Sequence, residues 1–268
     1  ACQAAGVDKA QIAGAGFGVA GYDFPSDREA HLTAIAALGL SCPMEVVNDG
    51  VNGLLAGTSY YVGVNVTAGS SVNCRGRGSD GREGRLVGNG IPFGEFGGGN
   101  EIVWKGLHMV NYAWIKRIPP TALTAIYLEA TGAKDEMDLM EGLSNHWYHL
   151  FPYIAVKVVE AAQAGDDAAQ QILRWAGEEL GWAAVSVIRQ IGMEGNEVEV
   201  VQSGSIFEAG PLITEPMRDV ILRHAPGAKL IRLDGPPVVG PVVLGMQMAG
   251  IDPYPMRAKL IATAKELV

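Results

Sequence analysis

The segment that ends in Asn48 and Asp49 is the first candidate for chemistry. Residues 45–48 predict a strand, which would put Asp49 at a strand's carboxyl end, where α/β sheets bind their ligands. A carboxylate in that place could take a proton from an attacking hydroxyl. Asn and Asp are also favoured helix N-caps, and on position alone a cap is the better-supported interpretation.

A turn of small residues is the second candidate. Gly69, Ser70 and Ser71 lie between two predicted strands, within residues 65–73. Consecutive small residues expose backbone N–H groups, and the hydroxyls add donors, so the turn could hold phosphate oxygens. An ordinary polar hairpin is the competing interpretation.

Ser203, Gly204 and Ser205 form the third candidate. They follow a predicted strand at 197–202 and precede a helix. The bare backbone of such a turn lets a ribose or a flat ring lie close to it. A plain strand-to-helix turn explains these residues equally well.

The fourth candidate is the glycine-rich segment 94–101. Its glycines could admit a substrate to a helix N-terminus, with Glu95 or Glu101 accepting hydrogen bonds from hydroxyls. The alternative is a flexible loop in which Glu101 favours the helix dipole. His146 and His149 lack a carboxylate one turn further on, so aromatic packing is the better interpretation and we predict no metal-ligating set.

The elements around these residues predict an α/β protein. Residues 12–56 alternate strand and helix, which implies a mainly parallel sheet. Three strands then follow with short turns, as expected of an antiparallel meander. Residues 101–191 are mostly helical, with breaks expected at 119–120 and 165–166. The predicted elements are strands at 12–21, 45–48, 60–67, 71–75, 82–87, 197–202 and 229–233, and helices at 27–38, 51–56, 101–191, 211–224, 238–249 and from 255 onward.

Composition excludes several classes of function. The 268-residue chain carries a net charge of −9, which argues against a nucleic-acid partner. Cys2, Cys42 and Cys74 form no CxxC pair, which predicts a reduced, cytoplasmic protein. No apolar run reaches the ~18–20 residues that span a bilayer. The chain begins at Ala1 in what reads as the tail of a helix, so we expect an upstream segment to be absent.

The order of these motifs and the sequence around them resemble one family. The chain resembles the N-acetylglucosamine kinase / BadF-BadG-BcrA-BcrD ATPase family of actin-like ATPases and sugar kinases, over essentially its whole length. The resemblance rests on residues 20–23, 27–28, 47–49, 73–75, 93–98, 120–124, 203–205 and 236–240.

The resemblance implies a two-lobed, actin-like (ribonuclease H-like) α/β fold with a truncated N-terminal lobe. The first lobe would comprise residues 1–60 joined by 245–268, and the nucleotide-binding lobe residues 61–244. ATP with Mg²⁺ would lie against the larger lobe and a sugar deep in the cleft, and a homodimer is compatible with the family. Asp49 would activate the sugar hydroxyl. The other implied site residues are Gly69, Ser70, Ser71, Ser203, Gly204 and Ser205 for the nucleotide, and Gly21, Asn48 and Glu95 for the sugar.

The expected activity is ATP-dependent phosphorylation of a sugar such as N-acetylglucosamine. Two alternatives remain within the family. An activator ATPase would need cysteines for an iron–sulfur cluster, and one candidate, Cys74, is a poor ligand set. A non-catalytic regulator is favoured by the altered loops, because the family's leading Asp-Gly-Gly-Thr hairpin is missing and the second phosphate loop reads Gly-Ser-Ser-Val.

Overall fold

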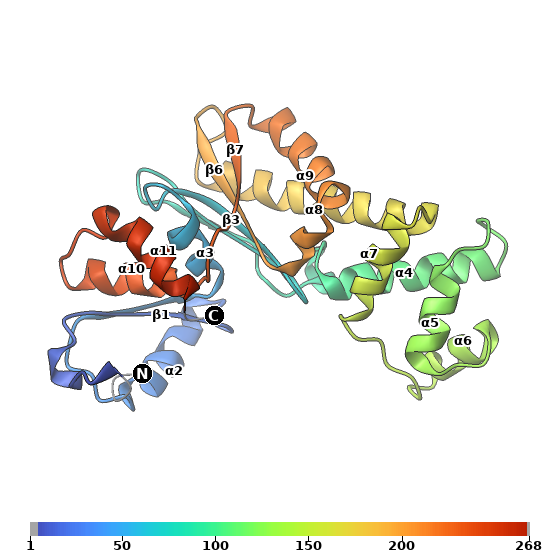
Figure 1. The fold of residues 1–268 in the computed structure, drawn as a ribbon, viewed down its shortest axis with the longest axis horizontal. Coiled ribbons are helices and arrows are strands. Elements are labelled where there is room, and N and C mark those ends of the chain that lie inside the picture. Colours follow the sequence, from blue (N-terminus) through green and yellow to red (C-terminus); the bar gives the residue numbers. More distant parts are fainter. Residues whose placement is uncertain (1–4, 267–268) are drawn as a thin grey trace.

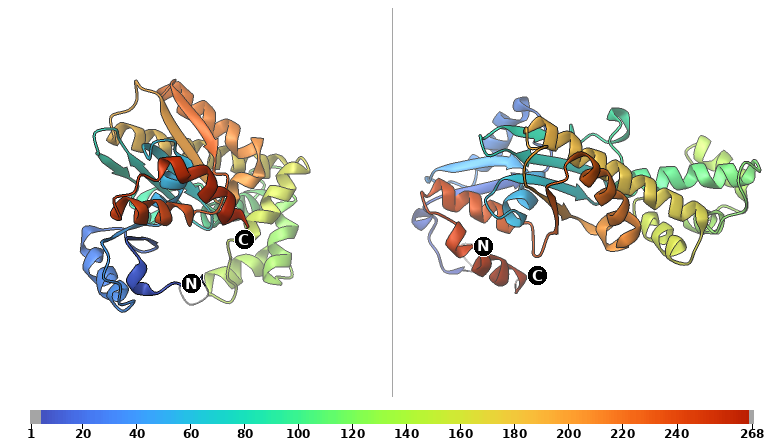
Figure 2. Two further views of the ribbon diagram at one scale, coloured as in Figure 1. Left: turned by 60° about the vertical axis from the view of Figure 1, so that its left-hand side comes forward. Right: turned by 90° about the horizontal axis from the view of Figure 1, so that it is seen from above.

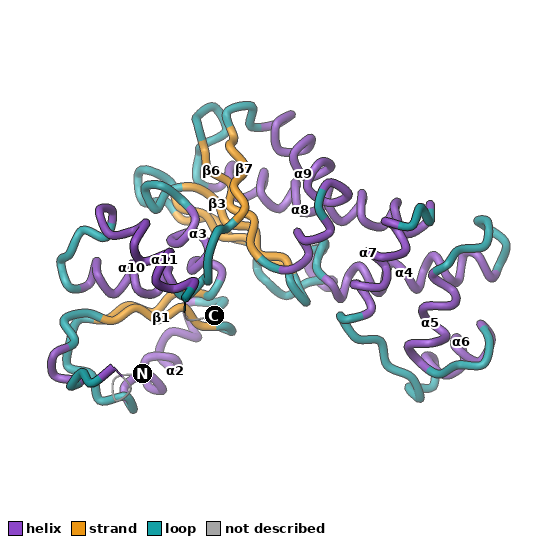
Figure 3. Tube along the Cα trace, viewed as in Figure 1, coloured by secondary structure: helices purple, strands orange, loops and turns teal. Residues whose placement is uncertain are grey.

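Two sheets organise the protein, for which we use a computed structural model that describes residues 5–266. Within that range, a two-stranded sheet pairs β1 (Ala15–Val19) with β2 (Met44–Asn48) in parallel, and a five-stranded sheet has the order β5-β4-β3-β6-β7. The strands lie in the middle of the molecule with helices on either side (Figure 3). Each sheet supports its own hydrophobic core, so the chain forms a small and a large lobe.

The small lobe is built from both ends of the chain. Helix α10 (Val239–Met248) packs on β1 and on α3 (Gly50–Gly57), and α11 (Arg257–Lys265) lies beside them (Figures 1 and 2). Their shared core includes Leu54, Leu55, Val239, Val243, Leu244 and Ala264. The returning chain joins this core first through the half-buried Leu233 and then through the buried face of α10, which begins at Val239. Helix α2 (Arg28–Ala36) connects β1 to β2.

The large sheet combines the predicted meander with two parallel strands. β3 pairs antiparallel with β4, and β4 with β5, which confirms the meander, while β6 runs parallel to β3 and β7 parallel to β6. The strands are β3 (Gly63–Ala68), β4 (Val72–Arg77), β5 (Glu83–Arg85), β6 (Val198–Ser203) and β7 (Ala228–Arg232).

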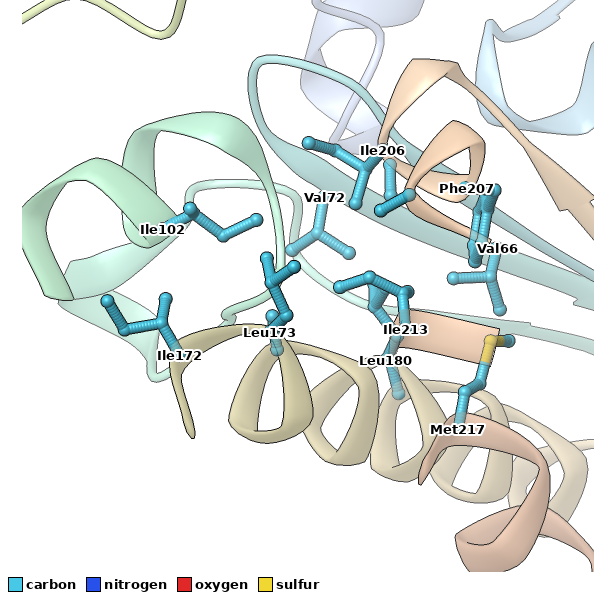
Figure 4. Close-up of a cluster of buried hydrophobic side chains, with 14 of the residues drawn as sticks. Val66, Val72, Ile102, Ile172, Leu173, Leu180, Ile206, Phe207, Ile213 and Met217 are labelled. Atoms are coloured by element: carbon cyan, nitrogen blue, oxygen red, sulfur yellow. The ribbon is translucent and has the colours of Figure 1, made fainter. Parts of the chain in front are cut away.

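Helices α8 and α9 cover one face of the large sheet. Val66 and Val72 on the strands face Leu180 of α8 and Met217 of α9 in the buried cluster (Figure 4). Helices α4 to α7 extend away from the sheet at the far end of the molecule (Figure 1). The helices of this lobe are α4 (Gly99–Trp114), α5 (Leu123–Thr131), α6 (Glu136–Ser144), α7 (Ile154–Gln163), α8 (Asp167–Gln190) and α9 (Pro211–His224). Among the helices of the described residues, none has the length and apolarity to cross a membrane.

Candidate functional site

Asp49 lies between the end of β2 and the start of α3, with its side chain exposed. Its backbone N–H donates to the Val19 carbonyl oxygen (3.1 Å), so the peptide continues the pairing with β1. The carboxylate accepts no capping hydrogen bond from α3. Asn48 does this work instead: its Oδ1 accepts from the Gly50 N–H at 2.8 Å. Asn48 thus caps the start of α3, whereas Asp49, the candidate proton acceptor, has a carboxylate that faces solvent.

Asn48 is a buried hub whose side chain has no polar atom to spare. Oδ1 also accepts from Asn73 Nδ2 (3.0 Å) and Arg75 Nε (3.0 Å). Nδ2 donates to Asp23 Oδ1 (3.0 Å) and to a backbone carbonyl (3.1 Å). The sequence-based expectation that Asn48 contacts a sugar is therefore not supported by its geometry, because both protons and the acceptor are already engaged within the protein.

Arg75, on strand β4 of the large lobe, binds both Asn48 and Asp23. Its Nη2 lies 3.1 Å from Asp23 Oδ1, and the residue is only 6% exposed. Burial lowers the pKa of Arg75, and the neighbouring Asp23 carboxylate opposes that shift, as does Asp49 more weakly. The ion pair joins strand β4 to the loop that follows β1.

Asn73 is a site residue that the motif analysis did not single out. It stands two residues before Arg75 on β4, and its Oδ1 is buried without a hydrogen-bond partner in the described protein. Buried polar atoms are nearly always paired, so an unpaired acceptor beside Asn48 suits a ligand hydroxyl or N–H group. Its spacing from Arg75 on one face of a strand was the available signal.

The turn at Gly69, Ser70 and Ser71 is docked on the start of α4. The Gly69 carbonyl accepts from Gly99 N–H (2.8 Å) and the Ser70 carbonyl from Asn100 N–H (2.9 Å). Both serine residues are exposed, and there is open space around the α-carbon of Gly69. The turn is thus held largely by its carbonyls. Ser71 Oγ accepts from Asn100 Nδ2 at 3.4 Å, which leaves the protons of both hydroxyls available to an anion.

The turn at Ser203, Gly204 and Ser205 lies directly beside the first. Thr67 pairs with Ser203 across β3 and β6, and a Cβ on Gly204, whose φ is +104°, would overlap the Ala68 carbonyl oxygen. The expected proximity of the two turns is present.

The hydroxyl of Ser203 is committed within the protein. It donates to Asn65 Oδ1 (2.9 Å) and lies 3.0 Å from the Thr67 hydroxyl. Ser203 is also only 3% exposed, so the expectation that it contacts the nucleotide is not supported. Ser205 is exposed and remains a candidate.

The Glu95 carboxylate binds the loop at residues 87–90 and does not face solvent. Its carboxylate accepts four backbone N–H groups, and the residue is 7% exposed. The donors are Val87 (2.6 Å), Gly88 (2.8 Å), Asn89 (2.9 Å) and Gly90 (3.1 Å). A direct contact with sugar hydroxyls is thus not supported for Glu95. The loop it shapes lies at the site, because a Cβ on Gly88 would be 3.5 Å from Asp23 Oδ1.

Gly21 precedes this cluster on the loop after β1. Its φ is +76°, it is exposed, and the space around its α-carbon is open, so a ligand can approach the backbone there. Within residues 5–266 no group of three or more His, Cys, Asp and Glu side chains could hold a metal ion.

Comparison with known proteins identifies the family. The profile of the BadF/BadG/BcrA/BcrD ATPase family matches residues 1–240. The chain belongs to this family. A relative, the N-acetyl-D-glucosamine kinase of Dictyostelium discoideum, is 27% identical over 215 residues, which cover 78% of the present chain and 67% of the relative.

Two solved structures share the fold of this chain. A candidate N-acetylglucosamine kinase from Chromobacterium violaceum gives a TM-score of 0.66 at 22% identity, covering 91% of this chain and 80% of its own. One from Porphyromonas gingivalis gives 0.61 at 15% identity, covering 91% and 81%. The predicted family is confirmed, and the α/β fold is that of sugar kinases of the actin-like ATPase type.

Proposed function

We propose that this protein is an ATP-dependent kinase that phosphorylates an amino sugar, N-acetylglucosamine or a close relative. The observation that carries the proposal is the Asp49 carboxylate, which is exposed and makes no hydrogen bond to the described residues. The start of α3 is tied to the large sheet, since Asn65 Nδ2 donates to the Gly50 carbonyl oxygen at 2.8 Å. Asn65 also accepts a hydrogen bond from Ser203. Strand β3 therefore contacts both the segment that carries Asp49 and the turn beside the proposed nucleotide site.

The division of labour follows from these positions. Asp49 would take the proton of the attacking sugar hydroxyl. Ser70 and Ser71 would hold phosphate oxygens, and the backbone at Gly204 and Ser205 would lie against the nucleoside. Mg²⁺ bound with ATP would neutralise phosphate charge, so the residues of the chain mainly position the reactants.

Sugar contacts would come from groups near Asp23. A Cβ on Gly88, in the loop at residues 87–90, would lie 3.5 Å from Asp23 Oδ1 and 3.8 Å from Asn73, whose Oδ1 is unpaired, and the backbone at Gly21 is open. Glu95 would act through that loop by holding its amides. These groups are acceptors and backbone donors, which suit hydroxyl and amide groups of an amino sugar.

Phosphate transfer from labelled ATP to a panel of hexoses and N-acetylhexosamines tests the proposal. We expect transfer to an N-acetylhexosamine, and Asp49→Asn should lower kcat by about 10²–10⁴-fold because the general base is lost. Calorimetry should show sugar and nucleotide binding retained in this isosteric variant. A folded wild-type protein that transfers phosphate to no sugar would overturn the proposal, and sugar binding without ATP binding would identify a regulator.

The remaining functional features are proposed on the same basis. Cys74 is fully buried and burial raises the pKa of its thiol, so it does not favour the iron–sulfur activator function. Use of ATP and a sugar substrate supports a cytoplasmic location. A homodimer follows from the family resemblance alone, and sedimentation of the purified protein would test it.

A further inference from the structure

A buried guanidinium from one lobe reaches the segment of the other lobe that carries the proposed base. Arg75 stands on β4 of the large lobe, and its partners Asp23 and Asn48 belong to the small lobe. Burying an ion pair costs desolvation, and apolar side chains of similar size often stabilise a fold as well or better. The presence of a charged pair at this junction therefore points to a task other than stability.

The contacts of Arg75 lead to the peptide group that follows Asp49. Arg75 Nε and the Gly50 N–H donate to the same Asn48 oxygen, at 3.0 and 2.8 Å. The peptide group that precedes Asp49 is held separately, because the Asp49 N–H donates to the Val19 carbonyl oxygen at 3.1 Å. The backbone around Asp49 is thus fixed on both sides, while its side chain stays free.

Gly50 supplies an independent sign that the arginine is built into this segment. A Cβ on Gly50 would lie 2.8 Å from Arg75 Cγ, which is closer than such atoms approach. The start of α3 therefore leaves room for the stem of Arg75, and a larger residue would push the guanidinium away from Asn48.

We propose that Arg75 is a positioning residue for Asp49, and that Asp23 holds Arg75 in the orientation that this requires. The inference rests on the proposed kinase function. Arg75 touches neither sugar nor nucleotide in this arrangement: it orients Asn48, which fixes the turn that aims the Asp49 carboxylate into the cleft. A misplacement of a reacting group by about 1 Å can cost about 10²-fold in rate.

The test compares three variants with a matched control. Arg75→Gln removes the charge, Arg75→Lys keeps it without the planar fork, and Asp23→Asn weakens the anchor while Arg75 stays bound to Asn48. Arg77→Gln is the control, because Arg77 lies two residues further along the same face of β4 and pairs with the exposed Glu83 at 3.3 Å. We would measure kcat, KM for ATP and sugar, and nucleotide binding by calorimetry.

We expect Arg75→Gln to lower kcat by about 10²-fold with KM for ATP nearly unchanged, and Arg75→Lys and Asp23→Asn to lower it less. Arg77→Gln should behave as the wild type. Folded Arg75→Gln with normal kcat would overturn the inference, and so would a loss that appears equally in Arg77→Gln. If Arg75→Gln does not fold, Asp23→Asn decides: normal kcat in that variant would also overturn it. The wild-type assay tests the kinase function separately, since only the variants bear on positioning.

Discussion

Two buried glutamates near the cleft, Glu95 and Glu101, differ in the number of backbone N–H groups that donate to their carboxylates. Glu95 receives four backbone N–H groups, so its charge is solvated by the loop it organises. Glu101 is 4% exposed but receives one, from Gly98 at 2.8 Å. Burial raises the pKa of Glu101, and its single amide donor does not offset this. Glu101 is therefore the buried glutamate with fewer backbone N–H donors.

This difference predicts a pH-dependent stability change for Glu101→Gln. Because the folded pKa of Glu101 is raised, the wild type gains stability relative to the variant below the unfolded pKa of about 4.3, and loses that gain as pH rises through the folded pKa. Urea unfolding from pH 4 to 7 should show the variant becoming more stable relative to the wild type. A difference that is constant, or that grows in favour of the wild type with pH, would contradict this.

Sequence reasoning at this scale selected residues that the structure shows to differ in how many of their polar atoms are free. Asp49 and the two turns could be found because their residue types imply donors and acceptors near strand ends. Glu95, Asn48 and Ser203 were expected to touch ligands, yet their partners are inside the protein. The partners of Glu95 are backbone amides. The partners of Asn48 and Ser203 are largely side chains more than 20 residues away along the chain, and a sequence does not show which of them will be close.

At the scale of elements, the contact between α8 and α9 depends on small residues of α8. A Cβ on Gly177 would overlap the Ile213 carbonyl oxygen of α9, and one on Gly181 would lie 2.7 Å from Val220 Cβ. Helix α9 therefore approaches α8 more closely than larger side chains would allow, and the two together cover the sheet.

Gly177→Ala should lower the free energy of unfolding, although alanine is the better helix former by about 1 kcal/mol. The overlap with α9 should cost about 1–3 kcal/mol and exceed that gain. Gly195→Ala is the control, since no atom lies within 4 Å of a Cβ there and its φ is not positive, so it should be neutral or slightly stabilising. Denaturant midpoints with unchanged slopes would report the difference, and equal midpoints would refute the argument.

Elements with a clear period or clear turn signals were predicted closely. The strand expected at 197–202 is Val198–Ser203, and the helix expected to end at 224 does end at His224. The first strand was expected over 12–21 and covers only Ala15–Val19. The residues at the two ends of the expected strand are glycine-rich and look apolar in sequence, but they do not pair with β2. Within the helical stretch 101–191, the breaks expected at 119–120 and 165–166 are present, between α4 and α5 and between α7 and α8. The breaks on either side of α6 were not predicted, because packing among the helices decides where each one ends.

At the scale of the molecule, the two cores differ greatly in size. The small one draws on residues 47–61 and on the returning segment from 233, whereas the large one spans residues 62–230. The family resemblance implied two lobes with a C-terminal return from 245, and the structure shows that α10 already contributes buried side chains to the small core from Val239. A boundary inside an unbroken apolar run, such as 238–244, has no local mark, because only the tertiary partner distinguishes the two lobes.

Arg257 joins α11 to the end of α3 within the small lobe. Its contacts lead to a prediction of how that lobe opens. Its Nη2 donates to the carbonyl oxygens of Ala56 and Gly57 at 2.9 Å each, which closes the end of α3. Because the small core holds few buried side chains, amides of β1 and α10 should exchange hydrogen before those of β3.

Arg257→Ala should speed exchange in α3, β1 and α10 selectively, because the α3 carbonyls lose their donor. Lys259→Ala, on the same helix and exposed, is the control and should leave every rate unchanged. Exchange measured by mass spectrometry on peptides from both lobes would separate local opening from global unfolding. Equal acceleration in β3 and β6 would mean that the lobes unfold as one unit, which would remove the argument that each lobe's own core sets its opening.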